Sequence, residues 1–180
     1  MCAFGQGTGG TSRACSGHVS TDIWGYVPDD AAARLRQNRV YGARFHIGGP
    51  DTAAHPFYKS EEISNVIDRV KLDRTLAACA EDAGADIREH HTVVDIDERH
   101  DGVTLTVSHA DGTETVRARM VAGCDGPTSR VRRPSDLPEP EEPLHGLLAF
   151  DPEPDDSAFA AVHLTPPRLF RGRIPRGPPG

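Results

Sequence analysis

One run, residues 120–133, constrains the fold most because its character changes twice along its length. The apolar residues 120–122 lead through Gly123 to Asp125 and Gly126, and a segment rich in Ser and Arg follows. This pattern predicts a strand, a tight turn and a helix N-terminus, where backbone N–H groups and the helix dipole can bind a diphosphate. Asp125 can accept hydrogen bonds from sugar or ribityl hydroxyl groups, and Gly126 permits close approach of a ligand. The run therefore predicts a dinucleotide site.

The same run resembles the second flavin-contacting motif, Gly-Ala-Asp-Gly-x-x-Ser-x-Val-Arg, of FAD-dependent oxidoreductases. That group includes aromatic hydroxylases, flavin halogenases and geranylgeranyl reductases. Cys124 stands where Ala is usual. The alternative is an ordinary strand-to-helix turn with a surface acid. The resemblance implies FAD as the cofactor, with Asp125 on the ribityl chain, Gly126 and the helix start on the diphosphate, and Pro127 and Ser129 as further contacts.

A second segment, residues 13–20, resembles the Cys-x-Gly-x-x-Ser segment near the start of geranylgeranyl reductases. In that family the cysteine lies close to the flavin and the hydrocarbon substrate. The resemblance implies that Cys15 and Gly17 face the reaction space and that Arg13 is among the cofactor-binding residues. Arg13 and His18 flank Cys15 and favour its thiolate form. A packing role for Cys15 beside the ligand is the alternative.

A third segment, residues 66–76, resembles the family's Arg-x-x-x-Asp-x-x-Leu, which opens the helix before the second flavin-contacting strand. The resemblance places Arg69 near the flavin edge. A helical stripe that begins at Leu72 and ends at Ala83 supports this helix, and Gly84 is its expected C-cap. The three segments occur in family order.

The rest of the chain reads mainly as short strands. Expected strands are 40–47, 63–67, 93–97, 103–107 and 113–121, with a hairpin turn at Asp111-Gly112. With the resemblance, the expected fold class is mixed α/β: a partial FAD-binding Rossmann-like domain, an antiparallel β-meander and part of a substrate-facing antiparallel sheet, which also takes in residues 144–150.

Five segments follow from this organisation. They are a glycine-rich start with the Cys-x-Gly segment over 1–39, part of the substrate-side sheet over 40–67, the helix, meander and second FAD motif over 68–133, a linker and the start of a substrate domain over 134–165, and a Pro/Gly/Arg-rich tail over 166–180.

Both ends depart from the family pattern. Gly5, Gly7 and Gly10 fit GxGxxG by letter, but we expect a loop there, because no apolar strand precedes them and no helical pattern follows. The first βαβ unit is therefore expected to be missing. The tail is expected to lack regular structure. By resemblance, Phe170 and Pro175 echo a Tyr-x-Trp-x-Phe-Pro substrate motif, and we expect a chain shortened or altered at both ends.

Composition limits the partners. Twenty basic residues against twenty-seven acidic ones give a net charge of −7, which disfavours nucleic-acid binding. Four cysteines without CxxC spacing indicate reduced thiols and no metal site. The basic stretch 168–176 is read as a flexible tail, or alternatively as a docking site for anionic lipid headgroups or an acidic protein. We expect a cytoplasmic protein, with peripheral contact at the inner face of the membrane as an extension.

The resemblance implies reduction of isoprenoid double bonds in archaeal-type lipids or related prenyl groups. Its implied partners are a prenyl lipid substrate and an electron donor, either NAD(P)H or a ferredoxin-like iron–sulfur protein. A flavin monooxygenase or halogenase is the enzymatic alternative. A catalytically inactive fragment or interaction module is the alternative of another class.

Overall fold

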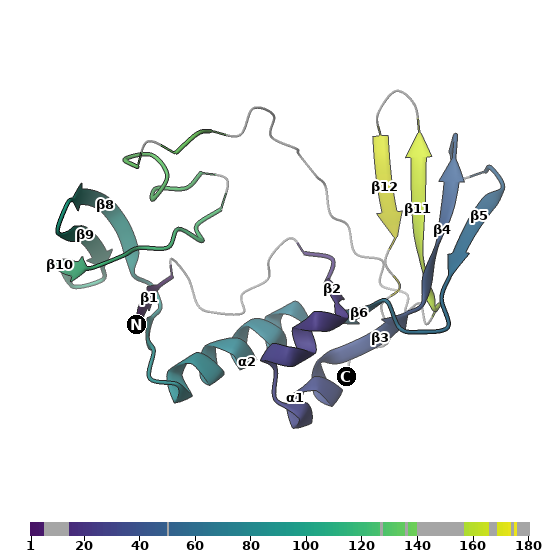
Figure 1. The fold of residues 1–180 in the computed structure, drawn as a ribbon, viewed down its shortest axis with the longest axis horizontal. Helices are drawn as coiled ribbons and strands as arrows, with labels where there is room; N and C mark the ends of the chain where they lie inside the picture. The colour runs from purple at the N-terminus through teal and green to yellow at the C-terminus, as the bar shows by residue number, and fades with distance from the viewer. Residues whose placement is uncertain are drawn as a thin grey trace. The chain divides into compact units, whose positions relative to one another are not determined.

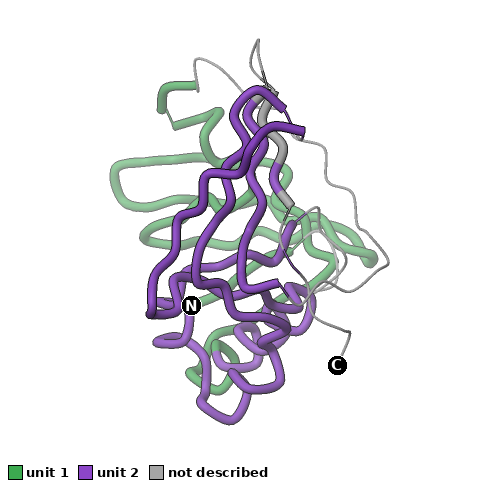
Figure 2. Tube along the Cα trace, turned by 90° about the vertical axis from the view of Figure 1, so that its right-hand side faces the viewer, with its two compact units in different colours: residues 1–11, 80–146 green, residues 12–79, 147–180 purple. Residues whose placement is uncertain are grey.

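The computed structural model describes residues 1–5, 15–49, 51–126, 128–135, 137–139, 157–165, 169–173 and 175. The chain divides into two compact units (Figure 2). Unit 1 comprises residues 1–11 and 80–146, and unit 2 comprises residues 12–79 and 147–180. Both units mix helical or turn segments with sheets, so the expected mixed α/β class is confirmed (Figure 1).

Unit 1 contains two sheets. A parallel pair joins β1 (Cys2–Phe4) to β7 (Asp86–Arg88). An antiparallel meander has the order β10-β9-β8, with β8 at Thr92–Arg99, β9 at Gly102–His109 and β10 at Gly112–Ala118. The expected meander is therefore confirmed.

The meander follows from the alternation in β9. Leu105 and Val107 are buried, whereas Thr104 and Thr106 on the other face are only partly covered. A strand with this period-two pattern buries one face of a sheet. The Asp111-Gly112 turn returns the chain into β10, and Gly112 has a φ of 139°.

Helix α2 (Arg69–Asp82) is also as expected. The carboxylate of Asp68 begins it by accepting hydrogen bonds from the backbone N–H groups of Val70 and Lys71, at 3.0 and 3.1 Å. Gly84 ends it with a φ of 86°, and the amide of Ala85 donates back to the carbonyl of Ala80 at 2.9 Å.

Unit 2 contains an antiparallel sheet of order β2-β6-β3, whose strands are His18–Ser20, Ser64–Ile67 and Arg36–Val40. A 3₁₀ helix, η1 (Thr21–Tyr26), and helix α1 (Asp29–Leu35) connect β2 to β3. Leu35 and Ile67 belong to one buried cluster of this unit, and the other members are Val27, Ala31 and Leu72.

A second sheet of unit 2 has the order β12-β11-β4-β5. Its strands are β4 (Gly42–Ile47), β5 (Ala54–Tyr58), β11 (Phe159–Thr165) and β12 (Leu169–Arg173). Strand β11 runs parallel to β4, so the expected substrate-side sheet is mixed rather than antiparallel. The expected strand over 40–47 is two strands that break at Tyr41. Residues 144–150 lie outside the described residues.

Two predictions about the chain ends are wrong, namely that no strand precedes the glycines and that the tail lacks regular structure. The loop predicted at Gly7 and Gly10 lies outside the described residues. Cys2–Phe4 is a strand, because its backbone pairs with β7, and the guanidinium of Arg88 lies over the Phe4 ring at 5.9 Å. Leu169–Arg173 is a strand, because it pairs with β11 from Thr165↔Leu169 to Ala161↔Arg173. In both cases long-range backbone pairing outweighs a local sequence pattern that lacks strand character.

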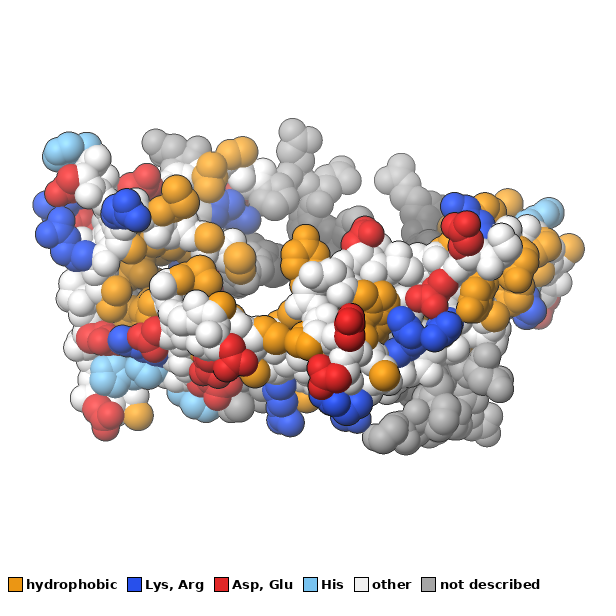
Figure 3. All heavy atoms as spheres, turned by 60° about the horizontal axis from the view of Figure 1, so that its bottom comes forward, with side chains coloured by type: hydrophobic (Ala, Val, Ile, Leu, Met, Phe, Trp, Pro, Cys, Tyr) orange, Lys and Arg blue, Asp and Glu red, His pale blue; other side chains and the backbone are white. Residues whose placement is uncertain are grey.

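The surface carries charges of both signs. On the face drawn in Figure 3, acidic and basic side chains are dispersed among hydrophobic ones. Among the described residues, no helix has the length and apolar character needed to cross a membrane.

Candidate functional site

The turn that carries Asp125 lies in unit 1 and is held by its own carboxylate. Asp125 accepts hydrogen bonds from the Ser129 hydroxyl at 2.5 Å, from the Arg130 amide at 2.6 Å and from the Val131 amide at 3.4 Å. The amide of Ser129 donates to the carbonyl of Gly126 at 3.1 Å. The carboxylate therefore ties together both sides of the turn.

These contacts decide the ionisation of Asp125. Slight burial acts to raise its pKa, but the hydrogen bonds from Ser129 and from the amides of residues 130 and 131 outweigh burial, so the pKa lies below its ordinary value. The side chain is exposed. Asp125 is therefore an accessible, ionised acceptor.

The glycines of this turn have different roles. Gly126 has a φ of 82°, a left-handed conformation, and a Cβ there would meet nothing within 4 Å. A Cβ on Gly123 would lie 2.7 Å from the Cβ of Val131, so this glycine permits close packing of the two sides of the turn. Gly126 accordingly serves the backbone conformation and Gly123 serves packing.

Two expectations for this run are wrong. The strand expected over 113–121 ends at Ala118, because residues 119–124 have no backbone hydrogen bond to any described residue. The helix expected after Gly126 is a series of turns over 128–135. The amides of residues 129–132 are hydrogen-bonded within the turn instead of pointing outward.

The turn therefore fits one part of FAD, the ribityl chain, but not the diphosphate. The exposed Asp125 carboxylate retains acceptor capacity for hydroxyl groups of a ribityl chain. The amides of residues 129–132, by contrast, donate to Gly126, Asp125 and Ser129. The turn suits a ribityl hydroxyl but does not present these four amides to a diphosphate.

Unit 2 brings Cys15 and Arg69 together, although they are 54 residues apart. The Arg69 guanidinium lies 3.9 Å from the Cys15 sulfur and donates to Asp73 at 2.6 Å. The hydrogen bond to Asp73, with smaller contributions that include Cys15, raises the pKa of Arg69. The backbone N–H of Gly17 also donates to the Cys15 sulfur, at 3.4 Å. The thiol thus lies between a fixed cation and an amide donor.

Gly17 fixes this loop against β6. Its φ is 75°, and a Cβ would lie 2.4 Å from the carbonyl oxygen of Ile67. The carbonyl of Gly17 also accepts a hydrogen bond from the Ile67 amide at 2.9 Å. Only glycine fits this position, because the backbone is left-handed and a side chain would collide with Ile67.

The structure gives little on the other four residues expected at the site. Arg13 and Pro127 lie outside the described residues. Phe170 lies in β12, but its side chain is not among those described. Pro175 is buried, and its carbonyl accepts from the Asn38 side-chain amide at 3.4 Å.

The sequence did not predict a polar contact between two side chains beside this loop. The Nε2 atom of His18 and the hydroxyl of Ser64 are 2.5 Å apart. Burial lowers the pKa of His18. A local signal could not reveal this pair, because it depends on the pairing of β2 with β6.

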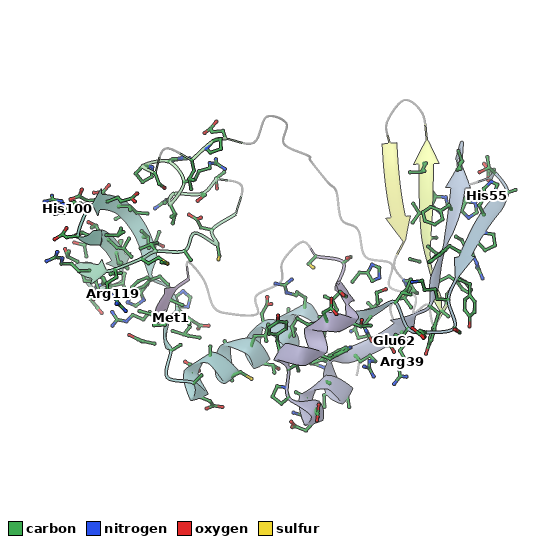
Figure 4. The ribbon with its side chains drawn as sticks, viewed as in Figure 1. Met1, Arg39, His55, Glu62, His100 and Arg119 are labelled. Atoms are coloured by element: carbon green, nitrogen blue, oxygen red, sulfur yellow. The ribbon has the colours of Figure 1, made fainter. Side chains whose placement is uncertain are left out.

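A second missed cluster lies on the other face of the same sheet. Arg36 donates to the buried side chain of Asn65 at 2.8 Å and lies over the Trp24 ring at 4.8 Å. Glu62 pairs with Arg36 at 3.9 Å and with Arg39 at 3.5 Å; Figure 4 shows Glu62 beside Arg39. In this cluster two arginines share one carboxylate, and the contacts tie β3 to Glu62 and Asn65.

Curated relatives of the chain include monooxygenases and a phospholipid reductase. It is 30% identical over 112 residues to 12-dehydrotetracycline 5-monooxygenase/anhydrotetracycline 6-monooxygenase of Streptomyces rimosus subsp. rimosus, covering 62% of this chain and 19% of that protein. It is 28% identical over 123 residues to digeranylgeranylglycerophospholipid reductase 1 of Methanosphaera stadtmanae, covering 67% of this chain and 30% of that protein. The chain thus spans less than a third of the length of either relative.

The fold is also found in solved structures. A geranylgeranyl bacteriochlorophyll reductase-like protein from Thermoplasma acidophilum superposes with a TM-score of 0.73 at 20% sequence identity, over 98% of this chain and 53% of that chain. This likeness establishes the fold.

The family described as FAD binding domain matches residues 29–156. That range contains both the Arg69 segment and the Asp125 turn, and it covers most of the chain. The chain therefore belongs to the FAD-binding domain family of FAD-dependent oxidoreductases.

Proposed function

We propose that this chain is the flavin-facing part of a reductase that saturates double bonds of prenyl lipids. The contact between Cys15 and Arg69, 3.9 Å apart, carries the proposal. It joins the two segments that resemble geranylgeranyl reductases in unit 2, the Cys-x-Gly loop and the start of α2. Gly17, in a left-handed conformation and in close approach to the Ile67 carbonyl, fixes the position of this loop.

An apolar sheet face in unit 2 supports a hydrocarbon substrate. Strand register places Phe45, Ile47, Phe57, Val162 and Leu164 on one face of the β12-β11-β4-β5 sheet. Ile47, Phe57 and Leu164 are 61%, 47% and 40% exposed. Exposed large side chains gathered on one face indicate an apolar binding surface, and a hydrocarbon chain offers no hydrogen bonds for recognition.

Bound FAD supplies hydride chemistry in such an enzyme. Within unit 2, Arg69, oriented by Asp73, would contact the flavin edge. Cys15 and Gly17 border the reaction space. The apolar sheet face holds the hydrocarbon and excludes water from it.

The test compares reduction with oxygenation in the purified chain. After addition of FAD, bound flavin is measured by its visible spectrum and by the rise in melting temperature. The protein is then reduced without oxygen and incubated with a geranylgeranyl lipid. Reduction predicts a product heavier by two hydrogen atoms per double bond, with less product from Cys15→Ser and unchanged product from Cys79→Ser.

A monooxygenase is the second candidate, favoured by the 30% identity to the tetracycline monooxygenase. It predicts oxygen consumption with NAD(P)H and an aromatic substrate, and a product that gains one oxygen atom. That result, with no lipid reduction, would overturn the reductase proposal. A protein that retains no flavin and forms neither product would instead support a non-catalytic interaction module.

A further inference from the structure

We infer that His18, held by Ser64, is the group that exchanges a proton with the substrate side of this site. The inference rests on the proposed function and adds a residue to which neither the family motifs nor the comparisons assign a role. The relevant residues all lie in unit 2.

The imidazole is fixed at one end. Its Nε2 atom lies 2.5 Å from the hydroxyl oxygen of Ser64, which is only 8% exposed. His18 as a whole is exposed, but its contact with Ser64 is partly buried, so the ring joins a buried hydroxyl to an accessible surface. A base held by a buried partner, with its other edge accessible, has the geometry of a proton-transfer residue.

The backbone also fixes the position of the ring. His18 follows Gly17 directly, and Gly17 is pressed against Ile67. The pairing of β2 with β6 sets His18 opposite Val66 and Ser20 opposite Ser64. The same loop that places Cys15 beside Arg69 therefore begins the strand that carries His18.

Among the described residues of these three strands, His18 is the one titratable residue on its face of the sheet. Register places it with Ser20 on β2, Ser64 and Val66 on β6, and Asn38 and Val40 on β3. Arg36 and Arg39 align with Ile67 and Asn65 on the opposite face. Asp22, beyond the end of β2, is engaged by Ser20 at 3.0 Å. An imidazole on an uncharged face is governed by burial, and burial lowers its pKa.

Reduction of a double bond requires a proton source as well as a hydride. Saturating a carbon–carbon double bond breaks its π bond and adds a hydride, with both electrons, to one carbon; reduced FAD, when bound, would supply that hydride. The other carbon takes a proton. The imidazolium of His18 would supply that proton through Nδ1 and recover one from solvent, while Ser64 acts as a positioning residue that holds Nε2.

The first test needs no turnover. Histidine ring ¹⁵N spectra of the whole chain identify the His18 signal by its loss in His18→Gln. The wild-type ring should populate one tautomer and titrate below its ordinary pKa. Ser64→Ala should give mixed tautomers, Ser64→Thr should restore the single one, and His100→Gln, an exposed residue on a turn, should change nothing. An ordinary pKa with mixed tautomers in the wild type would overturn the inference.

The second test uses the lipid reduction assay. Because the protonated ring is the donor, the rate should fall as pH rises through the pKa of His18. His18→Gln should lower the rate by about 10²-fold and remove this pH dependence, whereas His100→Gln should keep both. Turnover with an unchanged pH profile in His18→Gln would overturn the role of His18 and leave the proposed function intact. Absence of lipid reduction in the wild type would overturn both.

Discussion

Arg130 donates a hydrogen bond from Nη1 to the backbone carbonyl oxygen of Val93, 2.9 Å away. Val93 belongs to β8, and Arg130 follows the turn that carries Asp125. This side chain therefore attaches the turn to the meander within unit 1, in place of the strand pairing expected over residues 119–121.

Arg130→Ala should loosen the turn without unfolding the meander. One hydrogen bond of this kind contributes about 1 kcal/mol, so the amides of residues 129–132 should exchange with solvent several-fold faster. Arg133→Ala is the matched control, because the structure assigns Arg133 no bond to a described residue. Hydrogen exchange read by mass spectrometry or NMR checks this, and equal rates in both variants would contradict the anchoring role.

The Asp125 turn should be sensitive to acid. The pKa of Asp125 is lower in the folded chain than in the unfolded chain. Its contribution to stability is therefore fully present above the unfolded pKa, about 3.9, and is lost as pH falls through the lower folded value. The amide shifts of residues 130 and 131 should follow this titration. In Asp125→Asn they should be insensitive to pH over the same range; persistence of the titration there would assign it to another group.

Gly17→Ala should destabilise unit 2 strongly. The substitution forces Ala into a left-handed conformation and brings its Cβ within 2.4 Å of the Ile67 carbonyl oxygen. The strain alone costs about 1–3 kcal/mol. Gly25→Ala is the control, since a Cβ there meets nothing within 4 Å. Thermal melts should show a clear loss for Gly17→Ala alone, and equal melting temperatures would show that the loop is not pinned to β6.

Arg69→Gln should make Cys15 less reactive. The guanidinium 3.9 Å from the sulfur attracts negative charge on that atom by about 1 kcal/mol in water-like surroundings, so alkylation of Cys15 should slow several-fold without it. Alkylation at neutral pH, followed by peptide mass spectrometry, separates Cys15 from the exposed Cys2 and Cys124. Arg34→Gln removes a similar helical ion pair, with Asp30 at 3.0 Å, and should leave the rate at Cys15 unchanged. A faster or equal rate in Arg69→Gln would contradict the contact.

Residues 119–124 should exchange their amide hydrogens rapidly. They lack backbone hydrogen bonds to the described part of the chain, and Met120 is 84% exposed. Strand β10, immediately before them, pairs with β9 throughout and should be protected. Protection across 119–124 equal to that of β10 would show that the strand continues as its sequence predicts.

The sequence predicted the elements whose determinants are local. Helix α2 follows from its apolar stripe and Gly84, and β9 follows from the alternation of Val103, Leu105 and Val107. The hairpin at Asp111-Gly112 has a turn signal of its own. Helix α1 and η1 were missed, because they are short and their burial depends on Ile67 and Leu72 from later segments.

Features that depend on distant pairing could not be derived in this way. Strand β1 forms on β7, and β12 forms on β11, so neither has a sufficient local pattern. The strand expected through Val121 has the right pattern but finds no described partner. At the site, the structure brings Cys15 and Arg69, which come from two motif segments, within 3.9 Å of each other. The contact of His18 with Ser64 required the register of β2 on β6.

The amides after Gly126 already hold a negative charge, since the Asp125 carboxylate accepts from residues 130 and 131. An incoming phosphate group would compete with this internal anion for the same donors, and the two would repel each other. Affinity for anions at the turn should therefore be limited by the need to rotate Asp125 away. Asp125 is expected to bind the ribityl hydroxyl groups of a dinucleotide. In this conformation the same carboxylate competes with the diphosphate for the amide donors.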